Sequence, residues 1–193
     1  MKKSTIIILA VVAVVVVWAI GGYNGLVSSE ERVSESWANV ETAYQRRADL
    51  IPNLVNTVKG YASHEQATLQ AVTDARTRAT SINIDPATAT QQEVEEWMAA
   101  QQEVGSALGR LIAISESYPD LKANQNFLEL QAQLEGTKNR ISTERKRYNE
   151  VVKEYNVKTR RFPNNLIASI FGFDQKSMFE AAEGSDVAPV VEF

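Results

Sequence analysis

Fifteen consecutive apolar residues, at positions 6–20, constrain this chain more than any other feature. No charged side chain occurs from residue 4 to residue 29, a stretch of 26 residues. A helix needs about 20 predominantly apolar residues to cross the hydrocarbon core of a bilayer. The apolar run is shorter, but the uncharged residues that follow can extend it to Val27. We therefore expect residues 1–27 to form a transmembrane anchor.

The same segment also has the plan of a cleaved signal peptide. Lys2 and Lys3 precede an apolar run, and Ala19-Ile20-Gly21 weakly resembles a cleavage site. However, apolar residues at helical spacing resume directly after Gly25, without a proline or a polar break. This continuity favours an anchor that stays attached.

Charges on the two sides of the anchor predict its orientation. Lys2 and Lys3 precede it, whereas the residues that follow are mainly acidic: Glu30, Glu31, Glu35 and Glu41. Lys and Arg are enriched on the cytoplasmic side of membrane proteins. We therefore expect a cytoplasmic N-terminus, with the rest of the chain on the other side of the membrane.

Composition narrows the possible classes of function. The chain has no Cys and one His, which excludes disulfides, thiolate metal sites and multi-His metal sites. Beyond Val27 there are 18 basic and 24 acidic side chains, and a negative domain does not attract a nucleic acid. His64 and Glu65 are adjacent, so on a helix they do not face each other. We predict no enzyme activity, no metal, no cofactor and no nucleic-acid partner.

Apolar residues after the anchor recur at helical spacing in three stretches. The first is predicted to span residues 26–80, with Pro52 kinking or interrupting the helix. The second covers residues 88–118. The third covers residues 121–161, where nine positions alternate by three and four residues in a heptad pattern. The breaks are short, so successive helices should fold back as antiparallel neighbours.

The C-terminal part is predicted to add two short helices, at residues 165–171 and 175–182, followed by an extended tail at residues 184–193. The predicted fold class is therefore all-α. It is an elongated antiparallel helical bundle of three long helices plus short C-terminal helices, over residues 28–183, attached to the transmembrane helix.

Two pairs of residues are candidates for specific packing. Gly21 and Gly25 have the GxxxG spacing that lets membrane helices approach closely, although they could instead form a flexible joint. Arg47 and Glu144 occupy apolar stripe positions, and a structural ion pair between them would fix the register of the first and third helices. The alternative for Arg47 is a recognition site at the Pro52 kink.

Aromatic and Asn residues in the last third of the chain form two further patterns. Tyr148-Asn149 and Tyr155-Asn156 repeat after seven residues, which predicts rings in the core and Asn side chains that bond across helices. Phenylalanines also gather after the third helix. They either cover the open end of the bundle or form a surface for assembly, a partner or the membrane; the candidates are Phe162, Phe171, Phe173, Phe179 and Phe193.

These motifs resemble the LemA family, a group of bacterial membrane-anchored proteins. The matching segments cover nearly the whole chain: Tyr23-Asn24, residues 37–41, 46–55, 61–65 and 117–124, Tyr148-Asn149, Tyr155-Asn156, Phe162-Pro163 and residues 171–173. One departure is Lys138, where the family usually has an acidic residue.

The resemblance implies an all-helical antiparallel bundle on a single helix in the bacterial cytoplasmic membrane. It implies no particular activity. Relatives are associated with magnetosome membranes, and family genes often neighbour those of membrane metalloproteases. The family has also been drawn with its N-terminus outside the cell, opposite to the orientation that the charges predict.

The predicted function is a membrane-anchored, non-enzymatic scaffold. It would contact the lipid bilayer through its N-terminal helix, form homo-oligomers, and organise or shape the membrane. The alternative is a monomeric adaptor that presents the bundle to a membrane protease or a transport partner.

Overall fold

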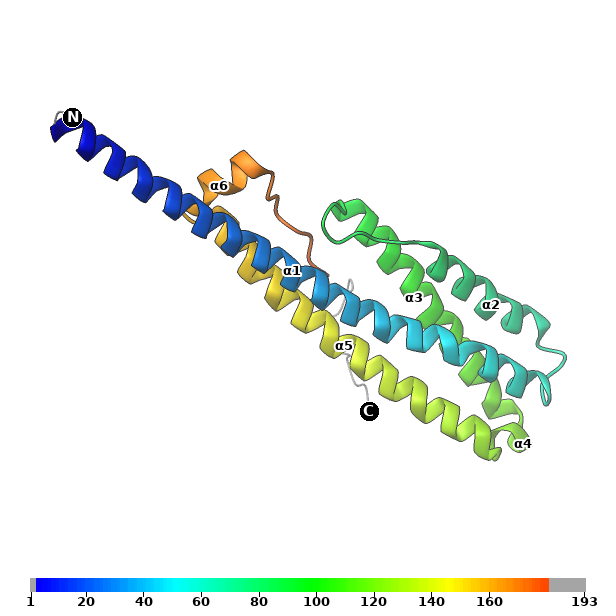
Figure 1. Cartoon of the computed structure of the whole chain (residues 1–193). Helices are drawn as coiled ribbons and strands as arrows, with labels where there is room; N and C mark the ends of the chain where they lie inside the picture. The colour runs from blue at the N-terminus through cyan, green and yellow to red at the C-terminus, as the bar shows by residue number, and fades with distance from the viewer. Residues whose placement is uncertain (1–2, 181–193) are drawn as a thin grey trace, which may run out of the picture.

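The computed structural model describes residues 3–180, which form a long helical rod (Figure 1). The expected tail at residues 184–193 lies outside this range. Within it the chain forms helices and no strand, which confirms the predicted all-α fold. In chain order the elements are α1 (Lys3–Lys59), α2 (Gln66–Ser81), α3 (Gln91–Ile114), the 3-10 turn η1 (Ser115–Ser117), α4 (Pro119–Lys122), α5 (Gln125–Arg160) and α6 (Asn164–Phe171).

Helix α1 is the axis of the molecule. Its 57 residues correspond to about 85 Å at 1.5 Å per residue. Its apolar part has a mean hydropathy of 2.8 over 18 residues, none of them buried. The helix passes residue 27 without a break and enters the bundle, where it buries Val33, Trp37 and Val40. One helix therefore carries both the apolar segment and a face of the core.

The other helices cover α1 unequally. Helix α5 runs antiparallel to α1 along most of the bundle, while α2 and α3 form a hairpin on the half of α1 that is far from the N-terminus (Figure 1). Helix α6 returns to the N-terminal half of α1. The predicted antiparallel arrangement of neighbouring helices is confirmed.

The predicted single helix over residues 26–80 is wrong. Pro52 lies inside α1 without ending it, because the carbonyl of Ala48, which loses its helical N–H donor there, accepts a hydrogen bond from Arg76 at 2.8 Å. The break comes instead between Lys59 and Gln66. It begins at Gly60, which has low helix propensity, and Ala62 then turns back into the core.

Side-chain caps set the starts of the other two long helices. At Thr90 the hydroxyl accepts from the backbone N–H of Glu93, and the Glu93 carboxylate accepts from the N–H of Thr90. The hydrogen bonds that the backbone N–H and the hydroxyl of Thr90 donate to the carboxylate lower the pKa of Glu93. Asn124 caps α5 by accepting from the N–H of Phe127 at 3.0 Å. Both caps satisfy N–H groups that have no partner within the helix.

The core consists of three clusters along the rod. The end farthest from the N-terminus is aliphatic and contains Ile51, Leu54, Val72, Leu111 and Phe127 among others. The middle cluster is aromatic, with Trp37, Tyr44, Trp97, Tyr148 and Phe179. The third cluster, formed by Leu26, Ile167, Ala168 and Phe173, lies next to the apolar part of α1.

The predicted short helix at residues 165–171 is confirmed by α6. The predicted helix at residues 175–182 is wrong for its described part, because residues 173–180 contain no helix. Their backbone groups bond to side chains of α5 instead of to each other, as described below.

Candidate functional site

The first candidate region is the junction at which α1 leaves its apolar run. Here α6 packs on α1 with almost no space between the two helices. A Cβ atom added to Gly22 would overlap Cδ1 of Ile167, so the absence of a side chain at Gly22 permits the contact. Leu26 completes the contact and is fully buried against Ile167 and Ala168.

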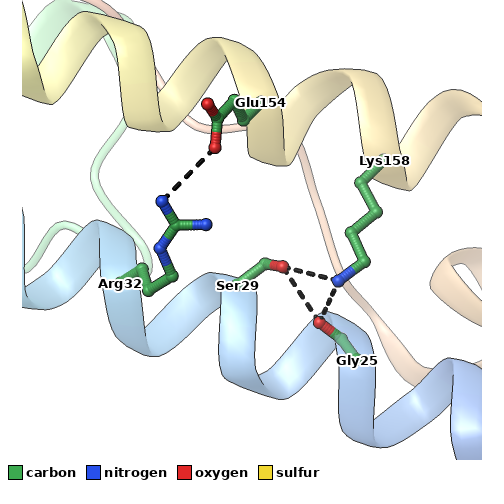
Figure 2. Close-up of polar contacts among 5 residues, drawn as sticks. All are labelled: Gly25, Ser29, Arg32, Glu154 and Lys158. Carbon is green, nitrogen blue, oxygen red and sulfur yellow. Dashed lines mark hydrogen bonds and ion pairs between the residues drawn. The ribbon is translucent and has the colours of Figure 1, made fainter.

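A polar contact joins α1 and α5 directly beyond this junction (Figure 2). The ammonium of Lys158 donates to the carbonyl of Gly25 and, at 2.7 Å, to the hydroxyl of Ser29. Arg32 and Glu154 form an ion pair one turn further at 3.4 Å. Both of these side chains are mostly exposed, so the pair adds little stability. Lys158 is the specific contact, because it satisfies a backbone carbonyl.

The two glycines predicted for helix packing have different surroundings. A Cβ atom added to Gly21 would have no neighbour within 4 Å, whereas one added to Gly25 would lie 3.3 Å from Nζ of Lys158 in the same chain. Helix α1 is continuous across both, so the structure contains no joint there. Gly22 was missed, because its partner Ile167 lies far along the sequence and no local spacing indicates the contact.

We expect Gly22→Val to destabilise the junction and Gly105→Val, on an exposed face of α3, to leave the unfolding midpoint nearly unchanged. A branched side chain at Gly22 would overlap Ile167, and overpacking of this kind costs about 1–3 kcal/mol. A Cβ atom added to Gly105 would have no neighbour within 4 Å. Thermal unfolding of the full chain in mild detergent, followed by circular dichroism, measures both. Equal unfolding midpoints for the two variants would contradict the close approach of α6.

The second candidate region is the extended segment 173–180, which we call the C-terminal clasp. Two Asn side chains of α5 hold its backbone. Asn156 donates to the carbonyl of Lys176 and accepts from its N–H, both at 2.9 Å. Asn149 makes the same pair of bonds with Phe179, at 2.8 and 2.9 Å. Each amide thus bonds to a backbone unit as a neighbouring β-strand would. The bonds predicted across helices are made to an extended segment instead.

Side chains of the clasp add two anchors. The Phe179 ring lies in an aromatic cage, with centroid distances of 5.5 Å to Trp37, 5.1 Å to Tyr148 and 6.1 Å to Trp97. The side chain of Lys176 is buried and pairs with Glu30 of α1 at 2.7 Å. It also donates to the carbonyl of Ala87, in the loop between α2 and α3. The clasp therefore connects α1, α5 and the α2–α3 loop.

Alkaline pH should weaken the clasp through Tyr148. Burial raises the pKa of Tyr148 from 10.0 to about 12, and its hydroxyl donates to the carbonyl of Ser177. The folded state favours the neutral phenol of Tyr148. This residue therefore stabilises the folded state below pH 10, and its contribution is lost as the pH rises through 12. We expect the free energy of unfolding to fall by about 2–3 kcal/mol over this interval from this residue.

A pH series of urea unfolding curves measures this effect, with Tyr148→Phe as the control. The variant should be less stable at neutral pH by about 1 kcal/mol, because the Ser177 carbonyl loses its donor. Its alkaline loss should be smaller than that of the wild type, although not zero, because burial also raises the pKa of Tyr44 and Tyr155. Parallel curves for the two proteins would refute the role of Tyr148.

The predicted phenylalanine surface divides into two parts. Phe173 and Phe179 are buried in the core, whereas Phe162 and Phe171 are exposed. Phe171 also lies against Tyr23 of α1, with ring centroids 4.9 Å apart. Phe193 lies outside the described residues. The predicted phenylalanine surface therefore contains two core residues and two residues of a separate surface beside the anchor.

Arg47 and Glu144 do not form the expected ion pair. Arg47 donates to the backbone carbonyl of Gln101 and to its side-chain oxygen, at 2.9 and 2.6 Å. Glu144 pairs with Arg147 on its own helix at 3.1 Å. The reason is that Arg47 points toward α3, whereas the prediction paired α1 with α5 only. Burial lowers the pKa of Arg47, and its guanidinium lies over the ring of Tyr44.

Arg47 lines a solvent-open cleft of about 930 Å³ between α1, α2 and α3. Arg76 also lines it and donates to the carbonyl of Ala48 at 2.8 Å. Arg46 and Asp49 lie on its α1 side. The cleft thus carries charges of both signs, and two of its arginines bond to backbone carbonyls of neighbouring helices. These two bonds hold α1, α2 and α3 together, so Arg47 and Arg76 serve the packing of the bundle.

The remaining polar candidate, His64, is exposed in the loop between α1 and α2. Its neighbour Glu65 accepts a hydrogen bond from the hydroxyl of Tyr118 at 3.1 Å, which raises the pKa of that tyrosine. Within residues 3–180, no group of three or more His, Asp or Glu side chains is placed to hold a metal ion.

Comparisons with known proteins agree with the resemblance in the sequence. A family model described as LemA family matches residues 36–193. Magnetosome protein MamQ 1 of Paramagnetospirillum magneticum is 27% identical over 186 residues, covering 88% of this chain and 68% of the relative. Protein LemA of Metamycoplasma hominis is 23% identical over 164 residues, covering 85% and 71%.

A further relative, magnetosome protein MamQ of Magnetospirillum gryphiswaldense, is 26% identical over 188 residues, covering 88% of this chain and 68% of the relative. The family model matches well over half of the chain, including the clasp, the cleft and α6. This protein therefore belongs to the LemA family.

Proposed function

We propose that this protein is a membrane-anchored, non-enzymatic scaffold that self-assembles at a bacterial cytoplasmic membrane and organises or shapes it. The observation that carries the proposal is the continuity of α1. One helix passes from an exposed apolar run into the core, where Val33, Trp37 and Val40 are buried. An anchor without a hinge transmits the orientation of the bundle to the membrane.

The polar groups and the relatives support a non-enzymatic role in a membrane. Lys158, Lys176, Asn149 and Asn156 all bond to backbone groups of other segments, so their chemistry is used to hold the bundle together. Two kinds of relative are named as magnetosome proteins and as LemA. An organising role at a membrane is consistent with both.

The surface for self-assembly is proposed on the apolar part of α1. Ala13, Val17 and Gly21 follow one another at four-residue spacing, and Ala13 and Val17 line a shallow apolar hollow. Gly21 is open on this face, while Gly25 is covered by Lys158. Ala13 and Gly21, about two turns apart on this face, are small residues that let a second helix approach closely.

The test is the particle mass of the full-length protein in mild detergent. We expect a defined oligomer for the wild type and for Val15→Leu, which lies on the other side of α1. Gly21→Leu should give smaller particles, because the added side chain blocks close approach. A monomeric wild type would overturn the scaffold. Particles of equal mass for both variants would show that the interface does not include Gly21.

The proposed orientation places the bundle on the extracytoplasmic side, with the anchor retained. Retention is supported by the continuity of α1, because the residues before and after Gly21 belong to one unbroken helix. Protease added to intact spheroplasts should digest the bundle. Protection until lysis would place it in the cytoplasm, and the mass of the membrane-extracted chain reports whether the anchor is cleaved.

A monomeric adaptor is the second candidate, and the cleft around Arg47 favours it. This cleft is open to solvent and lies between three helices of the bundle, so it could receive a polar segment of a membrane protease or transport protein. The adaptor requires a monomeric particle for the wild type, which is the result that overturns the scaffold.

A further inference from the structure

Exposed apolar side chains gather around α6. Phe162 and Ile170 are each 75% exposed, Phe171 is 57% exposed and Leu166 is 51% exposed. Among described residues after Tyr23, the other exposed large apolar side chains are less exposed: Tyr61, Leu128, Val157 and Met178. We call Phe162, Leu166, Ile170 and Phe171 the α6 patch.

The position of this patch along α1 is set by the junction. Twenty helical residues, counted from residue 4, span about 30 Å, the thickness of the hydrocarbon core. They end at Tyr23, next to Gly22, where Ile167 packs on α1. The α6 patch is therefore held at the level at which the anchor leaves the hydrocarbon.

The two faces of α6 differ in the way an interfacial helix requires. Ile167 and Ala168 are buried against α1, whereas Leu166 and Ile170, one turn apart, face outward. Arg160 at the end of α5 and Arg161 in the turn before α6 are exposed. Apolar side chains that enter the acyl boundary, beside basic groups that meet anionic headgroups, are typical of helices lying in the membrane interface.

We propose that α6 is a second membrane contact, with its patch inserted into the interface of an anionic bilayer. The occupant is the bilayer because the patch is continuous with the apolar surface of α1, through Tyr23 and Phe171. The inference depends on the proposed function only in requiring that α1 spans the membrane. Two contacts on one rigid body would fix the tilt of the bundle.

The chain contains no Cys, so single-cysteine variants can carry an environment-sensitive fluorophore without further changes. We would label Leu166→Cys and Ile170→Cys in the full chain, reconstituted in phosphatidylethanolamine–phosphatidylglycerol vesicles. Val14→Cys reports the anchor and is read with a second quencher lipid, whose nitroxide lies deep in the acyl chain, because residue 14 is near the middle of the 20-residue span. Leu128→Cys is the matched control, because it is exposed at the opposite end of the bundle. Circular dichroism checks that each variant is folded.

Lipids with a nitroxide near the headgroup should quench labels at 166 and 170 about threefold more than the label at 128, as expected for interfacial depth. Quenching at 14 but not at 166 or 170 would overturn the inference and leave the anchor intact. No quenching at 14 would overturn the anchor itself. Blue-shifted but unquenched labels at 166 and 170 would show a protein cover, such as a second copy, and would also overturn the inference.

A double variant keeps the test independent of labelling at the patch. Phe162→Ser with Ile170→Ser should weaken quenching of a label at Leu166 while quenching at Val14 stays the same. Unchanged quenching at Leu166 would contradict insertion of the patch.

Discussion

Replacing Trp37 by Ala is expected to lower the free energy of unfolding by about 4 kcal/mol, the range measured for large core aromatics. Trp37 is 2% exposed, and its ring contacts Trp97, Tyr148 and Phe179 at centroid distances of 5.3, 5.3 and 5.5 Å. Removing it leaves a cavity between α1, α3, α5 and the clasp.

Urea unfolding in mild detergent, followed by circular dichroism, measures this loss. Trp18→Ala is the control, because Trp18 is 39% exposed on the apolar run and makes no contact with the bundle core. We expect that control to unfold as the wild type does. Equal unfolding of the two variants would mean that the aromatic cluster does not hold the middle of the rod together.

The second large effect is expected for the double variant Asn149→Ala with Asn156→Ala. It removes four hydrogen bonds to the clasp backbone, each contributing about 1 kcal/mol. The clasp should then open at least about 100-fold more often, because the loss acts mainly on this segment. The clasp would still be held by the Phe179 ring in its aromatic cage, by Lys176 and by the hydroxyl of Tyr148.

Trypsin measures this opening directly. Lys176 is the only Lys or Arg after Arg161, and it is 8% exposed, so cleavage after it requires the clasp to open. The rate at which mass spectrometry detects loss of residues 177–193 should rise with the double variant. Asn139→Ala is the matched control, because Asn139 is exposed on the same helix. An unchanged rate would show that the Asn pairs do not hold the clasp.

Helical periodicity predicted most of the fold, because each long helix buries one continuous stripe. The heptad pattern on α5 identified Phe127, Ile141, Tyr148 and Tyr155, all of which are buried. Periodicity did not place the break after Lys59. Apolar spacing continues from α1 into α2, so the stripe alone cannot separate one helix from two that face the same core.

The site residues were harder to predict, because their partners are distant in sequence. Arg47 and Glu144 lie on the apolar stripes of α1 and α5, which suggested an ion pair. The Arg47 guanidinium donates to Gln101 of α3 instead. The Asn repeat on α5 indicated a bond across helices but not its partner. That partner is an extended segment, which has no periodic signal of its own.

The sequence by itself determined the class of protein: an apolar helix continuous with an all-helical domain, without residues for a thiolate or multi-His site. These properties follow from local propensity and composition. Only the tertiary structure decided that α6 packs against Gly22 and that Lys176 is buried beside Glu30. It also decided that the α6 patch remains exposed next to the anchor. Those outcomes depend on which distant surfaces meet, and contacts between distant segments leave no spacing in the chain that could reveal them.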